Sequence, residues 1–246
     1  MNAEEYSNLE RVEREHWYYA GKRELVRGWL ERLGVLKAEC RLLDAGAGTG
    51  FFARELRGRC RVQVLDDHPE SLAILRQHFT PEEIVDGTIR SERLKPASYD
   101  AITAMDVVEH VEHDAEMVRA IHTLLKPGGV AVVTAPASMA LWSDWDVVLH
   151  HYRRYSLESF KKLFADAGWE VLDARYTNGV VYPAVWLVRK WRTLRQKMGA
   201  PTDARTEDRL PPAWMNQLLK ATFVGTGRSW LRSPFGVSVL LVARKR

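Results

Sequence analysis

A glycine-rich loop with an acid in front of it follows the first apolar run of the sequence. It reads Asp44-Ala45-Gly46-Ala47-Gly48-Thr49-Gly50 and leads into a helical pattern. Glycines permit a tight turn and let a ligand lie against bare backbone near a helix N-terminus. The Gly-x-Gly-x-Gly spacing differs from the Gly-x-Gly-x-x-Gly of dinucleotide folds, and the preceding acid would repel a pyrophosphate. The loop therefore predicts a ligand that carries an ammonium or sulfonium group.

A pair of acidic residues ends the next apolar run. Asp66 lies 22 positions after Asp44, and Asp67 follows it directly. A carboxylate at this place can accept hydrogen bonds from both hydroxyls of a ribose. The two acidic positions and the glycine loop together favour a nucleoside without phosphates.

The residues around these motifs alternate between strand and helix patterns. Apolar runs at 41–44, 62–65, 84–85, 99–104, 130–134, 169–174 and 236–243 predict seven strands, and patterns at 51–57, 71–79, 114–125 and 156–168 predict helices between them. Such alternation predicts an α/β protein with a parallel sheet and helices on both faces. The parallel strands would bring their carboxyl ends, and hence both acidic motifs, to one edge.

The chain is expected to form one domain, 1–246. Its parts are a helical N-terminal cap (1–38), a ligand-binding core (39–175), a helical insertion that acts as a lid (176–235) and a last strand (236–246). The insertion holds an amphipathic segment (185–197), a polar link (199–212) and a second helical stretch (213–223). Residues 138–155 predict a long loop or a short irregular helix.

Composition bounds the class of protein. An apolar fraction of 46% with 28% charged residues excludes a disordered chain, and no apolar run approaches the ~20 residues of a membrane span. The acidic start predicts no secretory signal, and Cys40 with Cys60 cannot form a disulfide framework, so we expect a cytoplasmic protein. Residues 175–246 hold 14 Lys and Arg against 3 Asp and Glu, a net of +11, which leaves −7 for residues 1–174. That asymmetry indicates either contact with an anionic partner or a solvated basic face.

Five segments in order resemble those of the class I S-adenosylmethionine-dependent methyltransferases, of the small-molecule type. They are Leu42 to Gly50, Asp66 with Pro69-Glu70, Tyr99 to Ile102, Val107 to Val111 and Leu124 to Gly129. The resemblance spans about Leu42 to Ala174. It implies a Rossmann-like sheet of seven strands, S-adenosyl-L-methionine as cofactor and S-adenosyl-L-homocysteine as product.

The resemblance also implies a role for each matching residue. Gly46, Ala47, Gly48 and Gly50 would cradle the methionine part with Asp44 near its amino group, Asp66 and Asp67 would bind the ribose, and Met105 and Asp106 would line the sulfonium end. Outside the resemblance, His16 and Tyr19 would cover the cofactor from an N-terminal lid, unless Trp17 and Tyr18 only pack that segment. In Asp86-Gly87-Thr88, Asp86 or Thr88 would face the adenine, unless Asp86 only begins a turn.

A cluster of polar residues after the fifth strand is the candidate acceptor site. His151 is the expected general base, with His110 as the second candidate, because the ordinary pKa of histidine lies near 6.5. His150, Tyr152, Arg153 and Arg154 would bind an anionic part of the acceptor. The alternatives are that this loop is tied to the core by its polar groups and that Glu109-His110 is architectural.

The insertion is expected to select the substrate. Trp186 and its aliphatic neighbours lie beside Arg189, Lys190 and Arg192, which suits an apolar acceptor pocket, a peripheral contact of 180–197 with an anionic membrane, or plain core packing. We expect methyl transfer to O, N or C of a small hydrophobic or aromatic molecule. The alternative is a non-catalytic S-adenosylmethionine-binding protein whose basic C-terminal region contacts RNA, protein or membrane.

Several other chemistries are disfavoured. The segment Met105-Asp106-Val107-Val108 lacks the Asn/Asp-Pro-Pro-aromatic element that the fold uses on bases of nucleic acid, and both cysteines precede strands at the wrong edge for a thiol nucleophile. The loop spacing disfavours a nicotinamide. No dedicated metal site is expected, and Asp144 with Asp146 offers only a weak carboxylate pair. The oligomeric state is left open.

Overall fold

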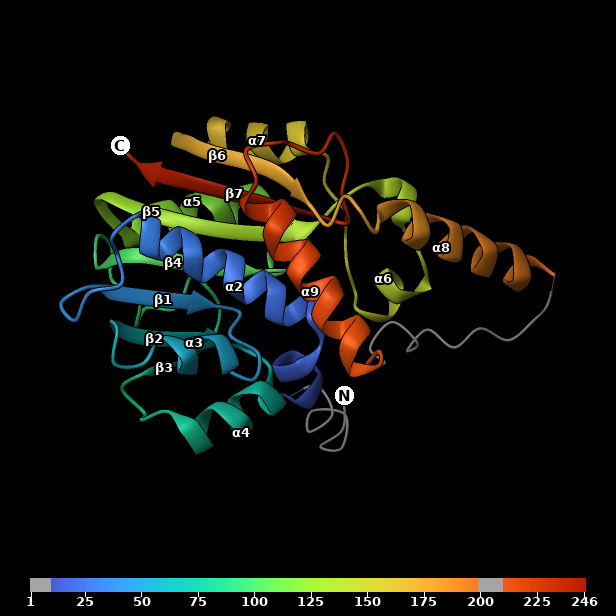
Figure 1. Cartoon of the computed structure of the whole chain (residues 1–246). Coiled ribbons are helices and arrows are strands. Elements are labelled where there is room, and N and C mark those ends of the chain that lie inside the picture. Colours follow the sequence, from blue (N-terminus) through green and yellow to red (C-terminus); the bar gives the residue numbers. More distant parts are fainter. Residues whose placement is uncertain (1–9, 199–209) are drawn as a thin grey trace.

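A seven-stranded sheet forms the centre of the protein (Figure 1). The computed structural model describes residues 10–198 and 210–246. The strands are β1 (Arg41–Ala45), β2 (Arg61–Asp66), β3 (Ile84–Asp86), β4 (Tyr99–Met105), β5 (Leu125–Pro136), β6 (Trp169–Thr177) and β7 (Ser238–Lys245). They lie in the order β3-β2-β1-β4-β5-β7-β6, as expected for the Rossmann-like class.

The sheet is mixed. Strands β1 to β5 pair in parallel, whereas β7 runs antiparallel to both β5 and β6 and lies between them. The parallel strands are buried on both faces, which is why their apolar runs show little alternation. Strand β5 begins at Leu125, earlier than the sequence predicted, because Leu125 pairs with Tyr99 beyond a bulge in the register.

Helices cover both faces of the sheet. They are α2 (Trp17–Arg32), α3 (Phe51–Leu56), α4 (Pro69–His78), α5 (Asp114–Leu124), α6 (Asp144–Val148), α7 (Leu157–Asp166), α8 (Tyr182–Lys197) and α9 (Ala213–Arg228), with 3-10 turns η1 (Val108–His110) and η2 (Met139–Leu141). Side chains of α5 and α7 fill one core, and side chains of α2, α3, α4 and α9 fill the other. The predicted irregular segment 138–155 contains η2 and α6.

The insertion divides into two helices with different surroundings. Helix α9 packs along α2 on the sheet, so closely that a Cβ at Gly21 would lie 2.6 Å from the Phe223 ring. Helix α8 instead projects from the body (Figure 1). One of the two helices of the expected lid, α9, is therefore part of the core, because its Phe223 and Val224 are buried. Most of the predicted link 199–212, residues 199–209, lies outside the described residues.

Candidate active site

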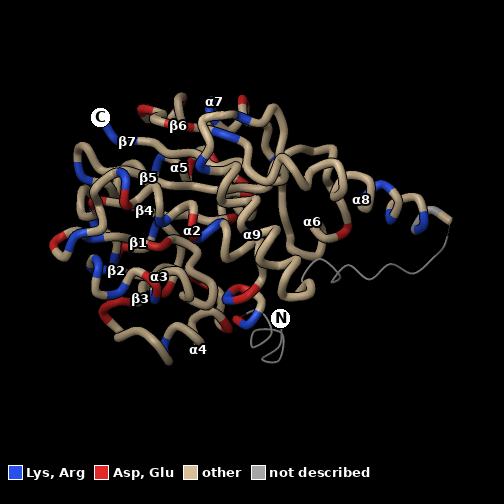
Figure 2. Tube along the Cα trace, viewed as in Figure 1, with Lys and Arg blue, Asp and Glu red and all other residues tan. Residues whose placement is uncertain are grey.

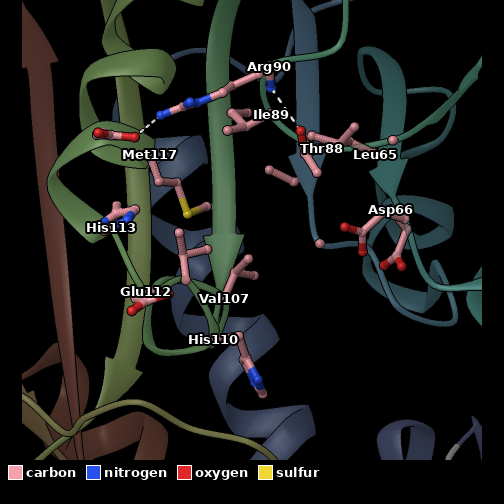
Figure 3. Close-up of a pocket in the computed structure, with 16 residues that line it drawn as sticks. Leu65, Asp66, Thr88, Ile89, Arg90, Val107, His110, Glu112, His113 and Met117 are labelled. Atoms are coloured by element: carbon pink, nitrogen blue, oxygen red, sulfur yellow. Dashed lines mark hydrogen bonds and ion pairs between the residues drawn. The ribbon is translucent and has the colours of Figure 1, made fainter.

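A first hollow of about 460 Å³ opens at the carboxyl edge between β1, β2 and β4 (Figure 3). Leu65, Ile89, Val107, Val111 and Met117 give it apolar walls, while Asp66, Asp67, Gly87 and Thr88 line it as well. Parallel strands end here together, which is how residues far apart in the sequence come to share one hollow. Its flat apolar walls with acids at one end suit a nucleoside.

Asp66 joins the end of β2 to the glycine loop. Its carboxylate accepts hydrogen bonds from the backbone N–H of Gly48 (2.9 Å) and of His68 (3.0 Å). Burial raises the pKa of Asp66 even though these two amides act in the opposite direction. The carboxylate is thereby fixed in place and still borders the hollow.

The glycine loop turns through left-handed backbone conformations. Gly46 has a φ of 69°, and a Cβ there would lie 2.5 Å from a methyl carbon of Val107. Gly50 has a φ of 70° and lies against Leu75 and Phe79, so it serves the packing of α3 and α4. Gly46 and Gly48 border the two hollows of the site, whereas Ala47 and Gly50 are not among their lining residues.

The structure places Asp86 and Thr88, the two candidates for binding the adenine, in different surroundings. The Asp86 carboxylate accepts a hydrogen bond from Arg76 of α4 (3.0 Å) and does not line the hollow, whereas Gly87 and Thr88 do. Asp86 is the last residue of β3 and its exposed carboxylate pairs with α4, so the structure favours Thr88 over Asp86 as the residue at the adenine end. Thr88 is the polar side chain that remains at this end.

Two further carboxyl groups lie close to the loop. Asp44 is buried, accepts a hydrogen bond from Thr103 Oγ1 (2.7 Å) and does not itself line a hollow. Burial first, and then nearby Glu13 and Asp66, raise its pKa to about 7 although the hydrogen bond from Thr103 acts in the opposite direction. Glu13, from the N-terminal helical segment 10–15, accepts a hydrogen bond from Thr49 Oγ1, and burial raises its pKa to about 7 as well.

A buried ion pair lies at the end of β4. Lys22 of α2 donates to the Asp106 carboxylate, and Thr134 Oγ1 donates to the same group (2.9 Å). Lys22 also donates to the Tyr18 hydroxyl (3.1 Å). Burial would lower the pKa of Lys22, but Asp106 and Tyr18 outweigh it and raise that pKa above its usual range. Asp106 is thus held in one position with its charge balanced.

A second hollow of about 640 Å³ adjoins the first and shares five lining residues with it. The shared residues are Gly46, Asp66, Asp67, Val107 and His110. Helix α2 and the residues before it contribute His16, Tyr18, Tyr19 and Lys22, and Met105 with Asp106 lies on the far side. A ligand in the first hollow can therefore extend into the second without leaving the protein.

The far wall of the second hollow holds a charge cluster built on Asp146 of α6. Its carboxylate accepts hydrogen bonds from His151 Nδ1 (2.9 Å) and Arg154 Nε (2.7 Å), and Arg189 of α8 lies 3.5 Å away. Burial alone would raise the pKa of Asp146, but the bonds from His151 and Arg154 bring it down to about 2. Asp146 therefore stays ionised and orients both His151 and Arg154.

His110 and Glu109 lie next to this cluster. The His110 and His151 rings meet edge to face with centroids 4.6 Å apart, and burial followed by the nearby His151 lowers the pKa of His110 to about 4. Glu109 is fully buried, both of its carboxyl oxygens lack a hydrogen-bond partner among the described residues, and burial raises its pKa well above the usual range. Of the two predicted bases, His151 is the one with an orienting carboxylate.

Glu109, His110 and His151 also bring one potential metal-ligating atom each to within 4.8 Å of one another. The weak carboxylate pair of Asp144 and Asp146 is not such a site, because the Asp146 carboxylate accepts hydrogen bonds from His151 and Arg154. The sequence predicts no metal requirement. Loss of activity in EDTA and its return with Mg²⁺ would contradict that prediction and direct attention to these three residues.

Four predicted acceptor residues lie elsewhere. His150 and Tyr152 are not among the lining residues of either hollow, and Arg153 pairs with Asp114 (2.7 Å) and with the Glu112 carbonyl. Trp186 is 38% exposed and does not line the second hollow, whereas its neighbours Val185 and Arg189 do. None of these four residues lines either hollow, whereas His151 and Arg154 of the 150–155 segment line the second one.

Sequence reasoning missed the roles of four residues. Glu13, Lys22, Asp146 and Arg189 come to the site from helices that the motifs do not include. The spacing of Tyr18 and Lys22, four apart on one helix face, was the only local signal for the α2 contribution. Asp146 carried no signal for its role, since its partners lie 5 to 43 positions away, and Arg189 was expected only as one of the cations beside an apolar acceptor pocket.

A family model described as "Methyltransferase domain" matches residues 16–174. The chain belongs to this methyltransferase family. The match covers every strand up to most of β6 and stops before α8, α9 and β7. The part of the methyltransferase that completes the second hollow thus lies outside the shared domain.

Relatives agree on the kind of reaction. A probable S-adenosylmethionine-dependent methyltransferase of Mycolicibacterium smegmatis is 29% identical over 170 residues, 68% of this chain and 64% of that protein. A ubiquinone biosynthesis O-methyltransferase of Xanthomonas campestris is 35% identical over 111 residues, 41% of this chain and 46% of that protein. The chain thus spans less than two thirds of the length of these curated relatives.

A solved structure shares the fold. It is phosphoethanolamine N-methyltransferase 2 from Haemonchus contortus in complex with S-adenosyl-L-methionine, with a TM-score of 0.59 at 19% sequence identity. The match covers 89% of this chain and 52% of that one.

The donor set fits the cofactor of the methyltransferase family. S-adenosylmethionine carries two positive charges, one on its ammonium group and one on its sulfonium group. Burial raises the pKa values of Glu13, Asp44 and Asp66, so these three carboxyl groups would be stabilised in their ionised form by a bound cation. The nucleoside would occupy the first hollow with its ribose at Asp66, and the methionine part would follow the glycine loop. Gly46, Val107 and His110, which line both hollows, would then border its sulfonium end.

Proposed function

We propose that the methyltransferase moves the methyl group to a hydroxyl oxygen of a small acceptor with an apolar or aromatic body. The observation that carries the proposal is the Asp146 cluster, in which a histidine and two arginines face the second hollow. Such a set of groups can remove a proton and stabilise the oxyanion that remains. A neutral amine acceptor needs neither function.

S-adenosylmethionine, when bound, supplies an electrophilic methyl group. Asp146 accepts the hydrogen of His151 Nδ1, which leaves Nε2 of that ring to take the acceptor's proton. Arg154 and Arg189 keep positive charge beside the oxygen that loses the proton. In-line displacement depends on holding the two reactants in one geometry, and the fixed Lys22–Asp106 pair together with the glycine loop supplies rigid walls.

The rest of the acceptor would contact a mostly apolar wall. Trp145, Leu149, Val181, Val185 and Val237 line the second hollow near His151. This wall supports a hydrophobic or aromatic body, and the name of the Xanthomonas relative, an O-methyltransferase of ubiquinone biosynthesis, supports an oxygen acceptor. The proposal includes a cytoplasmic location, supported by two free cysteines, Cys40 and Cys60.

The test compares His151→Ala with His150→Asn in methyl transfer from labelled S-adenosylmethionine to phenols, enols and amines. We expect His151→Ala to lower kcat about 100- to 10,000-fold while the Kd for S-adenosylhomocysteine, measured by calorimetry, stays the same. His150→Asn is the matched control, because asparagine tolerates the left-handed backbone of His150, whose φ is 57°.

Two results would contradict the proposal. Methylation of amines that does not depend on His151 would exclude the hydroxyl chemistry. Micromolar binding of S-adenosylhomocysteine without turnover of any acceptor would favour the second candidate, a non-catalytic S-adenosylmethionine-binding protein, for which the basic residues 175–246 are the supporting observation.

A further inference from the structure

Helix α8 carries an apolar stripe on the face that points away from the protein. Leu187, Trp191, Leu194 and Met198 are 61%, 56%, 57% and 69% exposed, respectively. Their spacing of four, three and four residues places them in one line along a helix. At 1.5 Å per residue the stripe is about 16 Å long. Isolated exposed apolar residues are normal on proteins, whereas a continuous line with a tryptophan indicates a partner.

The opposite face of α8 belongs to the protein itself. Val181, Val185 and Arg189 line the second hollow, and Arg189 donates to the Leu141 carbonyl of η2 and lies beside Asp146. These contacts fix the first turns of α8 to the body, while the later turns extend outward (Figure 1). The apolar stripe is therefore held at the surface and cannot turn inward without breaking the Arg189 contacts.

Cations flank the stripe on both sides. At 100° per residue, Lys190 and Arg195 lie about 70° to either side of the line, and both are exposed. The Arg195 guanidinium lies over the Trp191 ring, 4.8 Å from its centroid. The helix sequence YPAVWLVRKWRTLRQK contains no acidic residue, and Figure 2 shows only Lys and Arg colours along α8.

We propose that α8 docks on an anionic lipid bilayer, with the stripe in the interface and the flanking cations at the headgroups. No helix within the described ranges is long and apolar enough to cross a membrane, so the contact is peripheral. An apolar stripe between two rows of cations is the pattern of interfacial helices, in which apolar side chains enter the acyl boundary. A second copy would bring Lys190 and Arg195 of two stripes together, and their repulsion disfavours that occupant.

Docking in this way would bring the acceptor site close to the lipid. Val181 and Val185 line the second hollow from the other face of the same helix, so near Leu187 the width of α8, about 10 Å, would separate that hollow from the membrane surface. An apolar acceptor dissolved in the bilayer would then have a short path to His151. This consequence rests on the proposed function, whereas the docking itself does not.

The first experiment is vesicle sedimentation with the full chain. Vesicles of phosphatidylglycerol and phosphatidylcholine are compared with vesicles of phosphatidylcholine alone. We expect wild type to sediment with the anionic vesicles, and Trp191→Ser/Leu194→Ser to lower the partition coefficient about tenfold or more. The control is Trp214→Ser/Leu218→Ser on α9, two residues that are 69% and 59% exposed, where the nearby Lys220 is paired with Glu24 (3.1 Å).

A charge experiment separates the headgroup contribution from hydrophobic adsorption. Lys190→Glu/Arg195→Glu should lower partitioning onto anionic vesicles about tenfold or more, and salt should do the same to wild type. Lys95→Glu/Lys161→Glu makes the same change in net charge at exposed positions away from α8 and should have little effect. Unchanged binding of S-adenosylhomocysteine to every variant checks that the fold is intact.

Three outcomes would overturn the proposal. They are absence of wild-type binding to anionic vesicles, equal loss with the α9 control, and a dimer in sedimentation equilibrium that Trp191→Ser/Leu194→Ser abolishes. The last outcome would assign the stripe to a second copy of the chain. None of them depends on turnover, so a failed acceptor screen leaves the docking proposal separately testable.

Discussion

In the acceptor half of the site, Asp146 is surrounded by His151, Arg154 and Arg189, whereas in the cofactor half Glu13, Asp44 and Asp66 are close to one another. The pKa of Asp146 falls to about 2, and those of Asp44 and Glu13 rise to about 7. The protein therefore balances the charge of the acceptor half with its own cations. In the cofactor half Arg23 and Arg54 offset only part of the cost of burying Glu13, and the two positive charges of the cofactor would supply the rest.

The two halves of the site therefore depend on different interactions for their stability. The acceptor half is ordered by contacts within the chain and should depend on them for stability. The cofactor half carries carboxyl groups that are costly to ionise when no cation is bound, so removing one can stabilise the unliganded protein. Substitutions in the two halves should thus change stability with opposite signs.

The largest effect is expected for Asp146→Ala. It leaves Arg154 and Arg189 buried without their carboxylate, and removing one partner of such a cluster costs about 3–5 kcal/mol of unfolding free energy. Chemical denaturation monitored by circular dichroism measures it. Asp144→Ala on the same short helix is the control, because Asp144 is exposed and should cost less than about 1 kcal/mol. Equal losses would mean that α6 itself, and not the charge cluster, is what matters.

A smaller effect is expected for Asp66→Ala in the cofactor half. Loss of a carboxylate that binds ribose hydroxyls should weaken S-adenosylhomocysteine binding about 10- to 100-fold, the range for hydrogen bonds to a charged group. Calorimetric titration measures the Kd. Asp86→Ala should leave it unchanged, since Asp86 faces Arg76. An Asp86→Ala variant that binds as weakly as Asp66→Ala would restore Asp86 as the adenine residue.

The smallest effect, and the one with the opposite sign, is expected for Asp44→Asn. Folded Asp44 keeps its proton up to about pH 7, whereas the unfolded chain loses it near pH 3.9, so wild-type stability declines as the pH rises through this window. At about pH 7.5 the unliganded variant should be more stable than wild type by about 1–2 kcal/mol. Below about pH 4 the gain should vanish.

Unfolding curves at several pH values, with Asp86→Asn as the exposed control, measure this difference. Asp44→Asn should also weaken S-adenosylhomocysteine binding at neutral pH, because it removes negative charge near the amino group. A variant that is less stable than wild type at every pH would show that the hydrogen bond from Thr103 outweighs the cost of burial.

The same contrast explains what the sequence could predict. The loop at Gly46 and the acid Asp66 follow directly from strand ends, so local pattern and family resemblance place them at one edge. The place of Asp86 outside the hollow did not follow from the local pattern, because its side chain pairs with Arg76 on a neighbouring helix. Lys22, Asp146 and Arg189 reach the site only through the packing of α2, α6 and α8, and no local pattern encodes which partner a helix will meet.

Strand β7 has a consequence for how the chain is made. It lies between β5 and β6, yet residues 178–237 separate it in sequence from β6. During synthesis both neighbours leave the ribosome with unpaired, largely apolar edges and wait for a strand that arrives later. The sheet therefore cannot be completed until residues 238–245 have been synthesised, and unpaired strand edges are prone to aggregation during such an interval.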